Sequence, residues 1–329
     1  MTILNASEWD AFLKDHPEAH LLQNSAWGEL KSDFGWEVIH VRVENCGAQV
    51  LFKALPLGFR VAYIPKGPVG KNWNLLWPEL HHICQTKKVV FLKVDPDAWE
   101  DSGELISSQM AGFNKVNRTI QPRRTIVVSL DGSEEAWLDR MKQKTRYNIR
   151  LAQRKEVIVH SSNDVQTFHK MMLLTGSRDK FGVHSIEYYQ RAYSLFASLG
   201  LCNLLQADVN GTPVAGLMAF VFGKRSWYFY GASTDEARNH MPTYLLQFEA
   251  MRWAAQKGAS EYDLWGVPDV DESKLEENFS NKSDGLWGVY RFKRGFGGRL
   301  LRSVPPYDYV YIPWLYNFYL LWMGNRVEG

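Results

Sequence analysis

Alternating stretches of helical and strand-like hydrophobic periodicity organise the first half of the chain. Helical spacing of apolar residues predicts helices over residues 7–13, with Ser7 as the capping residue, and over residues 74–85; another helix begins at Ala26. Alternation of apolar and polar residues, or a short apolar run, predicts strands between them. These strands cover residues 36–42, 48–55, 61–64 and 89–94. Asn45-Cys46-Gly47 is predicted to turn the chain between the first two strands.

The second half of the chain repeats this pattern. Helices are predicted over residues 165–175, 185–198 and 243–257. Strands are predicted over residues 201–209, 213–222, 227–230 and 261–265. Asn210-Gly211 separates the first two of these strands and is a strong signal for a tight β-hairpin.

The two halves share one order of elements. Gly47 and Pro96 in the first half stand in places like those of Gly211 and Pro268 in the second half. The similar offsets of the two pairs predict an internal duplication. Helices, an antiparallel meander, a further helix and a strand follow one another in this order in the GNAT acyltransferase fold. We therefore predict an α/β (α+β) chain of two tandem GNAT-like domains, with the cleft between them as the default site.

Composition narrows the classes of function. The formal net charge of +2 is close to neutral, so any nucleic-acid contact must come from a local patch. Cys46, Cys84 and Cys202 lack metal-ligand spacing, and so sparse a set fits a reducing compartment without a disulfide framework. We recognise neither a signal peptide nor an apolar run long enough to span a membrane, so we expect a cytoplasmic protein. The apolar tail over residues 309–323 is expected to be a buried closing element.

A glycine-rich segment near the C-terminus is the strongest candidate for chemistry. Residues 286–292 have helical apolar spacing and are followed by glycines at 295, 297 and 298. The cations of this segment are Arg291, Lys293 and Arg294. Glycine allows a backbone to approach a ligand closely, which would place a cation beside that ligand. The alternative, which the residues leave open, is an ordinary helix C-terminus with cations opposing the dipole and glycine as the cap.

A cationic stripe is predicted on a helix in the middle of the chain. Its members recur every four residues: Lys142, Arg146, Arg150 and Arg154. Met141, Ile149 and Ala152 lie away from the stripe. Like charges at this spacing repel one another, so an anion such as phosphate would stabilise the helix. The alternative is a solvated face that is relieved by acidic residues elsewhere.

Several segments together resemble the FemABX family of peptidoglycan interpeptide-bridge aminoacyltransferases. The matching segments, in family order, are residues 23–31, 142–152, 244–254, 262–266 and 288–298. The resemblance implies two GNAT-like domains without a coiled-coil arm. The first, on the acceptor side, would comprise residues 1–138 and the returning tail 306–329. The second, on the aminoacyl-tRNA side, would comprise residues 139–305.

The resemblance also implies an activity. Members move an amino acid from aminoacyl-tRNA to a stem-peptide amine of a peptidoglycan precursor, either lipid II or UDP-MurNAc-pentapeptide. The expected partners are therefore aminoacyl-tRNA and this precursor, with peripheral contact to the inner face of the membrane through lipid II. No DNA, cofactor or metal ion is expected. A GNAT-type enzyme using acyl-CoA is one rival, although residues 239–243 lack the glycines of a pyrophosphate loop. A non-catalytic module that binds the precursor or tRNA is the other.

Catalytic and acceptor-binding residues follow from the same resemblance. Lys293 with Phe292 resembles the element that meets the developing oxyanion or the tRNA 3′ end. As a neutral base for the acceptor amine, Lys293 would need a pKa lowered by burial, which the neighbouring Arg291 and Arg294 would assist. No Ser-His-Asp or Cys-His set points to a covalent intermediate.

Two further pairs would hold the acceptor. Lys31, four residues after Trp27, resembles the lysine that binds the acceptor phosphates. His184 and Tyr188 are the nearest match to an arginine and tyrosine pair that binds the UDP precursor. Histidine in place of arginine weakens phosphate binding. The tRNA would contact the stripe together with Arg291 and Arg294.

Overall fold

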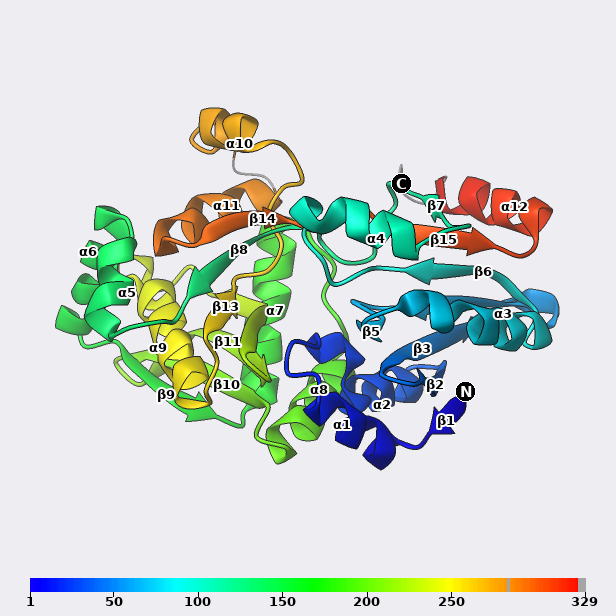
Figure 1. Cartoon of the computed structure of the whole chain (residues 1–329). Helices are drawn as coiled ribbons and strands as arrows, with labels where there is room; N and C mark the ends of the chain where they lie inside the picture. Colours follow the sequence, from blue (N-terminus) through cyan, green and yellow to red (C-terminus); the bar gives the residue numbers. More distant parts are fainter. Residues whose placement is uncertain (283–284, 325–329) are drawn as a thin grey trace. The chain divides into compact units, whose positions relative to one another are not determined.

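The computed structural model describes residues 1–282 and 285–324 and divides into two compact units. One unit is Met1–Arg123 together with the segment that begins at Ser303. The other is Arg124–Arg302. We describe each unit by itself (Figure 1).

The first unit is built on a mixed sheet with the strand order β1-β2-β3-β4-β6-β15-β7, and β5 pairs with β3. Its strands are β1 Thr2–Leu4, β2 Trp36–Val43, β3 Cys46–Ala54, β4 Arg60–Ile64, β5 Val69–Gly70, β6 Val89–Val94, β7 Asn114–Lys115 and β15 Tyr307–Val310. Its helices are α1 Ala6–Lys14, η1 Leu21–Gln23, α2 Ser25–Asp33, η2 Pro56–Gly58, η3 Trp73–Leu75, α3 Trp77–Thr86, η4 Glu100–Ser102, α4 Gly103–Gln109 and α12 Pro313–Gly324. Among the described strands of this unit, β4 and β6 pair in parallel and the other pairs are antiparallel.

Alternation along β6 divides the first unit into two packed layers. Leu92 and Val94 face the core that includes Trp77 and Leu80 of α3. The side chains that alternate with these two point to the other face of the strand. There the Phe91 ring lies 5.1 Å from the ring of Tyr316 in α12. Both faces of β6 are covered in this way, which accounts for the burial of every residue of this strand.

The second unit carries a sheet of order β14-β8-β13-β12-β11-β10-β9. Its strands are β8 Arg124–Ser129, β9 Ile158–Ser162, β10 Cys202–Val209, β11 Thr212–Phe222, β12 Arg225–Ser233, β13 Glu261–Asp263 and β14 Arg299–Arg302. Its helices are α5 Glu134–Arg140, α6 Gln143–Arg154, α7 Val165–Asp179, α8 Ile186–Ser198, η5 Arg238–His240, α9 Pro242–Gln256, α10 Glu272–Asn278, α11 Leu286–Lys293 and η6 Arg294–Phe296. Leu217 and Ala219 of β11 share a core with α6 and α9.

The predicted duplication is confirmed by the topology of the two sheets. In the first unit the antiparallel meander β2-β3-β4 is followed by α3 and then by β6, parallel to β4. In the second unit the meander β10-β11-β12 is followed by α9 and then by β13, parallel to β12. Each meander is preceded by a pair of helices, α1 and α2 or α7 and α8.

The two predicted hairpin turns differ in outcome. Asn210 and Gly211 both have positive φ, 52° and 75°, as a type I′ turn requires. The first turn is shifted, because Cys46 already pairs with Val43 and the turn residues are Glu44 and Asn45. Gly47 is needed for packing instead: a Cβ there would come within 2.8 Å of the Trp9 ring.

The domain boundaries differ from the prediction of 1–138 with 306–329 and 139–305. Residues 124–138 belong to the second unit, because β8 pairs with β13 and β14. Ser303 and Val304 belong to the first unit, since their amides donate to the carbonyl oxygens of Arg123 and Ala98.

The apolar tail is only partly the buried closing element that we expected. Strand β15 extends the first sheet beside β6. In α12, however, Trp314, Phe318 and Leu321 are 67%, 66% and 70% exposed. One side of this helix therefore packs on the unit while the other faces outward.

Candidate active site and binding residues

Lys293 is a buried lysine at the end of α11. Its side chain is held by the segment that follows β13, where Nζ donates to the carbonyl oxygens of Trp265 at 3.1 Å and Gly266 at 2.9 Å. Only 4% of the residue is exposed. The segment does end a helix, with Arg291 and Lys293 in the last turn of α11, but both acceptors of Lys293 Nζ lie outside α11, so this ammonium does not cap its own helix.

Burial sets the protonation of this lysine. Desolvation lowers the pKa of Lys293 to about 7, and the carboxylate of Asp263 acts in the opposite direction. The ring of Tyr228 lies 5.5 Å from Nζ. The causes of the shift do not include Arg291 or Arg294, so the assistance expected from these neighbours is not needed. Near neutral pH a large fraction of Lys293 is therefore the free amine.

Asp263 and Trp265 shape the lysine site, and sequence reasoning did not select them as site residues. Trp265 adopts a left-handed backbone conformation with φ 61°, which is unusual for a bulky residue. Asp263 Oδ1 stabilises this turn by accepting from the Trp265 amide at 2.7 Å and from the hydroxyl of Thr125. Strained backbone of this kind concentrates at functional sites. The signal in the sequence was the Tyr-Asp-Leu-Trp-Gly segment at 262–266, read only as a family match.

Phe292 supports the helix that carries the lysine. Its ring packs edge-on against Tyr244 of α9, at 4.9 Å, and against Phe296, at 5.1 Å. It therefore anchors α11 to the core of the second unit and fixes the position of Lys293.

The glycines after α11 make room for the protein's own chain. A Cβ at Gly295 would overlap the hydroxyl of Thr145, and a Cβ at Gly297 would overlap the carbonyl oxygen of Arg140. Gly295 also accepts a hydrogen bond of 2.9 Å from the backbone amide of Lys142. Close approach to a ligand, which we expected of these glycines, is thus replaced by close packing against α5 and α6. Gly297, with φ 78°, ends the short η6 helix.

The two arginines beside Lys293 have different surroundings. Arg294 Nε donates to Glu276 Oε1 at 2.8 Å, the Arg294 Nη2 group pairs with the second oxygen, and the guanidinium lies 3.9 Å from the Phe279 ring. The Arg294 hydrogen bond lowers the pKa of Glu276. This arginine is therefore committed to a structural ion pair. Arg291 is exposed.

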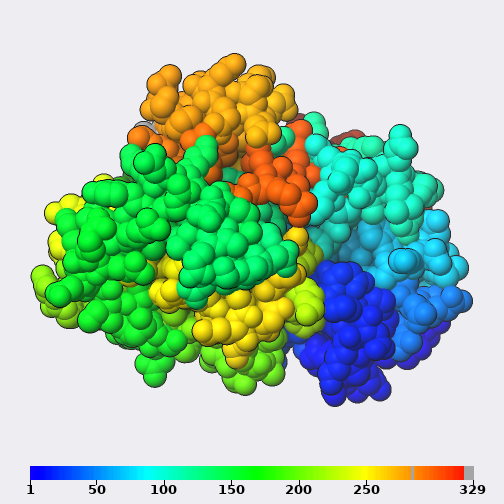
Figure 2. All heavy atoms as spheres, turned by 60° about the vertical axis from the view of Figure 1, so that its left-hand side comes forward, coloured from blue at the N-terminus to red at the C-terminus, as the bar shows by residue number. Residues whose placement is uncertain are grey.

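The cationic stripe contains three exposed residues and one structural residue. Lys142, Arg150 and Arg154 are exposed on or beside α6, whose side of the second unit is brought forward in Figure 2. Arg146 Nη1 instead donates to carbonyl oxygens at the end of α5, including that of Met141 at 2.5 Å. Arg146 thus differs from the other three members, because its Nη1 group caps the end of α5.

Lys31 and Trp27 form a stacked pair on α2. The Lys31 ammonium lies 4.5 Å from the centroid of the Trp27 ring, a cation–π distance. Trp27 is only 7% exposed, while Lys31 is partly exposed. The side chain of Asn24 caps the helix by accepting from the Ala26 amide at 3.0 Å. The Lys31 ammonium is thus held in place by the buried Trp27 ring on a capped helix.

His184 and Tyr188 also lie together. Their rings stack with centroids 4.1 Å apart at an angle of 23°. His169 approaches the His184 carbonyl oxygen at 3.1 Å, and Ser185 caps α8 through the Tyr188 amide. Tyr188 is buried, so the histidine is the more exposed member of the pair.

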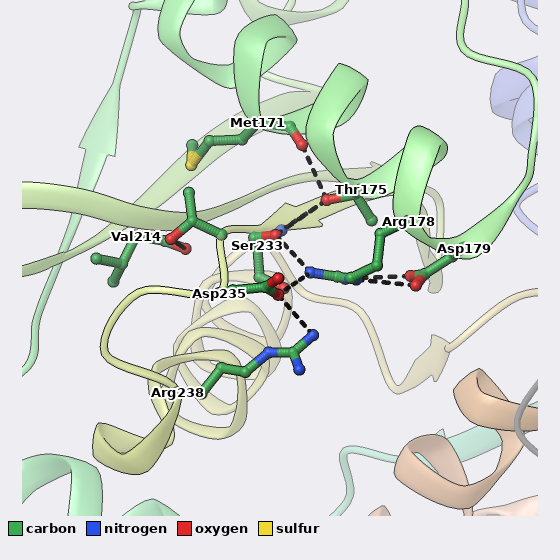
Figure 3. Close-up of polar contacts among 9 residues, drawn as sticks. Met171, Thr175, Arg178, Asp179, Val214, Ser233, Asp235 and Arg238 are labelled. Atoms are coloured by element: carbon green, nitrogen blue, oxygen red, sulfur yellow. Dashed lines mark hydrogen bonds and ion pairs between the residues drawn. The ribbon is translucent and has the colours of Figure 1, made fainter.

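The loop before α9 is fixed by a network around Arg178 (Figure 3). Arg178 at the end of α7 pairs with Asp179 and Asp235, both at 2.9 Å, and donates to the Ser233 carbonyl oxygen. Pro242 occupies the first turn of α9 and so removes one backbone donor there. The N-terminus of α9 therefore offers fewer amides to a pyrophosphate than a glycine loop would.

Comparison with known protein families decides the identity of the chain. The model of the FemAB family matches residues 4–210 and 200–322. The chain belongs to the FemAB family. It is therefore an aminoacyltransferase, an enzyme of peptidoglycan biosynthesis, as the resemblance predicted.

Curated members of the FemAB family align over nearly the whole chain. The lipid II:glycine glycyltransferase of Staphylococcus saprophyticus subsp. saprophyticus is 27% identical over 384 residues, covering 92% of this chain and 90% of the relative. The enzyme of the same name from Staphylococcus aureus strain USA300 is 27% identical over 391 residues, covering 92% and 91%.

Solved structures confirm the predicted fold of this FemAB-family chain. The crystal structure of FemX has a TM-score of 0.85 at 24% identity, covering 97% of this chain and 99% of FemX. A tandem GNAT protein from the clavulanic acid biosynthesis pathway has a TM-score of 0.51 at 10% identity, covering 93% and 97%. Within residues 1–282 and 285–324 no coiled-coil arm is present, and α7 and α9 have 15 residues each. In the same residues no helix is long and apolar enough to cross a membrane.

Proposed function

We propose that this chain transfers an amino acid from aminoacyl-tRNA to the stem-peptide amine of a peptidoglycan precursor, with Lys293 as the base. The observation that carries the proposal is the geometry of Lys293. In its neutral form the amine has two hydrogens, which the carbonyl oxygens of Trp265 and Gly266 accept, and one remaining lone pair. That lone pair can take a proton at neutral pH, because the pKa is about 7.

The proposed step is a direct acyl transfer. The acceptor amine attacks the carbonyl carbon of the aminoacyl ester and forms a C–N bond. The ester C–O bond breaks, and the ribose hydroxyl of the tRNA leaves. Lys293 takes the proton that the amine loses and passes it to the leaving oxygen, after which it is again neutral. Once protonated, its ammonium also stabilises negative charge at the reacting carbonyl.

Acceptor binding is proposed for the pair on α2. The Lys31 ammonium, held over the Trp27 ring, suits a phosphate group. Relatives over nine-tenths of the chain are named for lipid II, which supports the lipid-linked precursor as acceptor. His184 stacked on Tyr188 provides an aromatic surface with at most one positive charge, so it supports a weaker phosphate contact than arginine would.

Donor binding is proposed for the exposed cations of the second unit. Lys142, Arg150 and Arg154 beside α6, together with Arg291 on α11, are exposed and suited to tRNA phosphates. Arg146 and Arg294 are assigned supporting roles instead, since the first caps α5 and the second pairs with Glu276.

Mass spectrometry of a reconstituted reaction tests this function. The purified chain is incubated with charged tRNAs and either lipid II or UDP-MurNAc-pentapeptide, and the precursor is examined for the mass of one added amino acid. We expect a product that disappears with RNase and that acetyl-CoA does not replace. Transfer from acetyl-CoA in RNase-treated samples would instead identify a CoA-dependent enzyme. Tight binding of both substrates with no product from any charged tRNA would identify a binding module.

A further inference from the structure

Helix α12 combines a packed side with an exposed apolar side. Tyr316 and Tyr319 lie on Phe91 of β6, both with ring centroids 5.1 Å away. Trp314, Phe318 and Leu321, spaced as neighbours on one helical face, are 67%, 66% and 70% exposed. The helix, shown in red in Figure 1, contains no charged residue. A contiguous exposed apolar face of this kind marks an interaction surface.

A cavity of about 350 Å³ lies beneath the packed side of α12. It is lined mainly by rings and aliphatic groups from β4, β6, α12 and the segment 116–120, and it contains a buried charge cluster. Within this cluster Lys93 Nζ pairs with Asp308 at 2.7 Å, and Tyr316 donates to the other oxygen of Asp308 at 2.7 Å. The Asp308 carboxylate is thereby already matched by Lys93.

Arg118 is the second cation of this cavity, and among the described residues no carboxylate pairs with it. Its Nη1 is fully buried and has no hydrogen-bond acceptor in the part of the chain that the structure describes. A buried donor without an acceptor is costly. Because Arg118 as a whole is partly exposed, an anion from outside the chain can reach its guanidinium and stabilise it. Ile120, two residues further on and also in the cavity wall, is 53% exposed. The segment therefore links the buried cation to the apolar surface.

One kind of occupant satisfies both features. It must cover the apolar face of α12 and supply an anion to Arg118. A second copy packing through the same helix would bring no carboxylate, because α12 has none. Residues Pro313–Gly324 form a helix of 12 residues, long enough to lie in a lipid interface but too short to span a bilayer. Tryptophan, phenylalanine and leucine are typical of the apolar face of a helix that lies in this interface.

We propose that α12 binds the surface of an anionic phospholipid membrane, with Trp314, Phe318 and Leu321 in the lipid interface and Arg118 bound to a lipid phosphate. This site lies within the first unit and goes beyond the proposed transfer reaction. It would bring the enzyme to the surface that displays a lipid-linked acceptor, whichever amino acid is transferred.

Vesicle flotation of the full chain tests the proposal without any activity measurement. The probes are vesicles of phosphatidylcholine alone and of phosphatidylcholine with phosphatidylglycerol. We expect binding to the anionic vesicles, and we expect Trp314→Ser/Phe318→Ser/Leu321→Ser to weaken it at least tenfold. Arg118→Gln should weaken it about fivefold. All substituted side chains of the triple variant are exposed, so the variant should fold, which circular dichroism checks.

Matched control variants distinguish binding through this surface from non-specific hydrophobic binding to vesicles. Ile3→Ser/Leu57→Ser/Leu105→Ser removes three other exposed apolar side chains of the first unit and should bind vesicles like the wild type. Lys71→Gln, which removes an exposed cation outside the cavity, should also leave binding unchanged.

Three results would overturn the proposal. The first is that the wild type does not bind vesicles. The second is that the two triple variants lose vesicle binding to the same extent. The third is that the wild type and Arg118→Gln each bind neutral vesicles as well as they bind anionic vesicles. A dimer in sedimentation velocity that only the α12 variant dissociates, without vesicle binding, would assign the face to a second copy instead.

Discussion

The Lys293 ammonium nitrogen lies 2.9 Å from the carbonyl oxygen of Gly266, in a site so buried that its pKa falls to about 7. An ordinary lysine is fully protonated at neutral pH and is a poor base. Burial against backbone carbonyl groups converts this lysine into a group that gains and loses a proton in the working range of an enzyme. The chemistry we propose follows from that property.

Removing the lysine should remove most of the catalysis. We expect Lys293→Met to lower kcat by about tenfold to a hundredfold or more, the range for losing an acid–base or charge-stabilising group. The KM for the acceptor should change little, because the proposed acceptor contacts lie elsewhere. Steady-state kinetics measure both, with the exposed Lys257→Met as a control. Near-wild-type kcat in Lys293→Met would reduce the lysine to a structural role.

The pH dependence should identify which form of Lys293 acts. A base must be neutral, so kcat/KM should rise as pH increases through about 7, the pKa of Lys293. A group acting only as a cation would give the opposite slope. The acceptor amine also titrates, so the pH profile of Lys293→Met is the reference. In that variant the rise of kcat/KM near pH 7 should vanish. Lys293→Arg keeps the charge but cannot act as a base, and substantial activity in that variant would favour the electrostatic role.

Asp263 is predicted to position and tune the lysine. Its carboxylate raises the pKa of Lys293 against the effect of burial, so Asp263→Asn should move the limb of the pH–rate profile to lower pH. The amide oxygen of asparagine can still accept from the Trp265 amide, which keeps the turn. A profile that is lowered in rate but not shifted in pH would indicate that Asp263 serves only the fold.

The acceptor site should respond through KM. Lys31→Ala removes a cation that we assign to a phosphate, and one charge-assisted contact is worth roughly 1.5–3 kcal/mol. We therefore expect the KM for the acceptor to rise about tenfold to a hundredfold with kcat nearly unchanged, since phosphate binding is the same in ground and transition states. Lys14→Ala on α1 is the matched control. An unchanged KM would exclude Lys31 from the site.

Binding of tRNA should depend on salt through the exposed part of the stripe. Replacing Arg150 and Arg154 by glutamine should lower the log–log salt slope by about 0.7 for each single-strand phosphate contact that is lost. Arg146→Gln should instead lower thermal stability, because its guanidinium caps α5. Filter binding between low and moderate salt measures the slope. Identical slopes in the double variant and the wild type would leave these arginines as a solvated face.

Strands and turns were predicted well because the residues that determine them are neighbours in the sequence. The meanders follow from period-two alternation, and the Asn210-Gly211 turn from the positive φ that glycine and asparagine tolerate. The boundary at Arg123 was missed because β8 pairs with strands far along the chain. The exposed side of α12 was missed because apolar residues occupy both sides of the helix apart from Asn317, so periodicity does not select the packed face.

The candidate site was predictable only in part. Lys293 was found through its segment and the family resemblance. The Glu276 partner of Arg294 lies 18 residues away in the chain, so neighbouring residues do not indicate this ion pair. Asp263 gave no signal of its own, since its role depends on the turn at Trp265 and on Thr125, which is 138 residues distant.

The hydrogen bond from the Lys142 amide to the Gly295 carbonyl oxygen has a mechanical consequence. Gly295 is also packed so closely against Thr145 that it leaves no space for a methyl group. The start of α6 and the chain just after Lys293 are thus held together by a hydrogen bond and by close packing. A displacement of the start of α6 would therefore also displace the backbone that follows the lysine. Any joint movement of the two would change the direction in which Lys293 points.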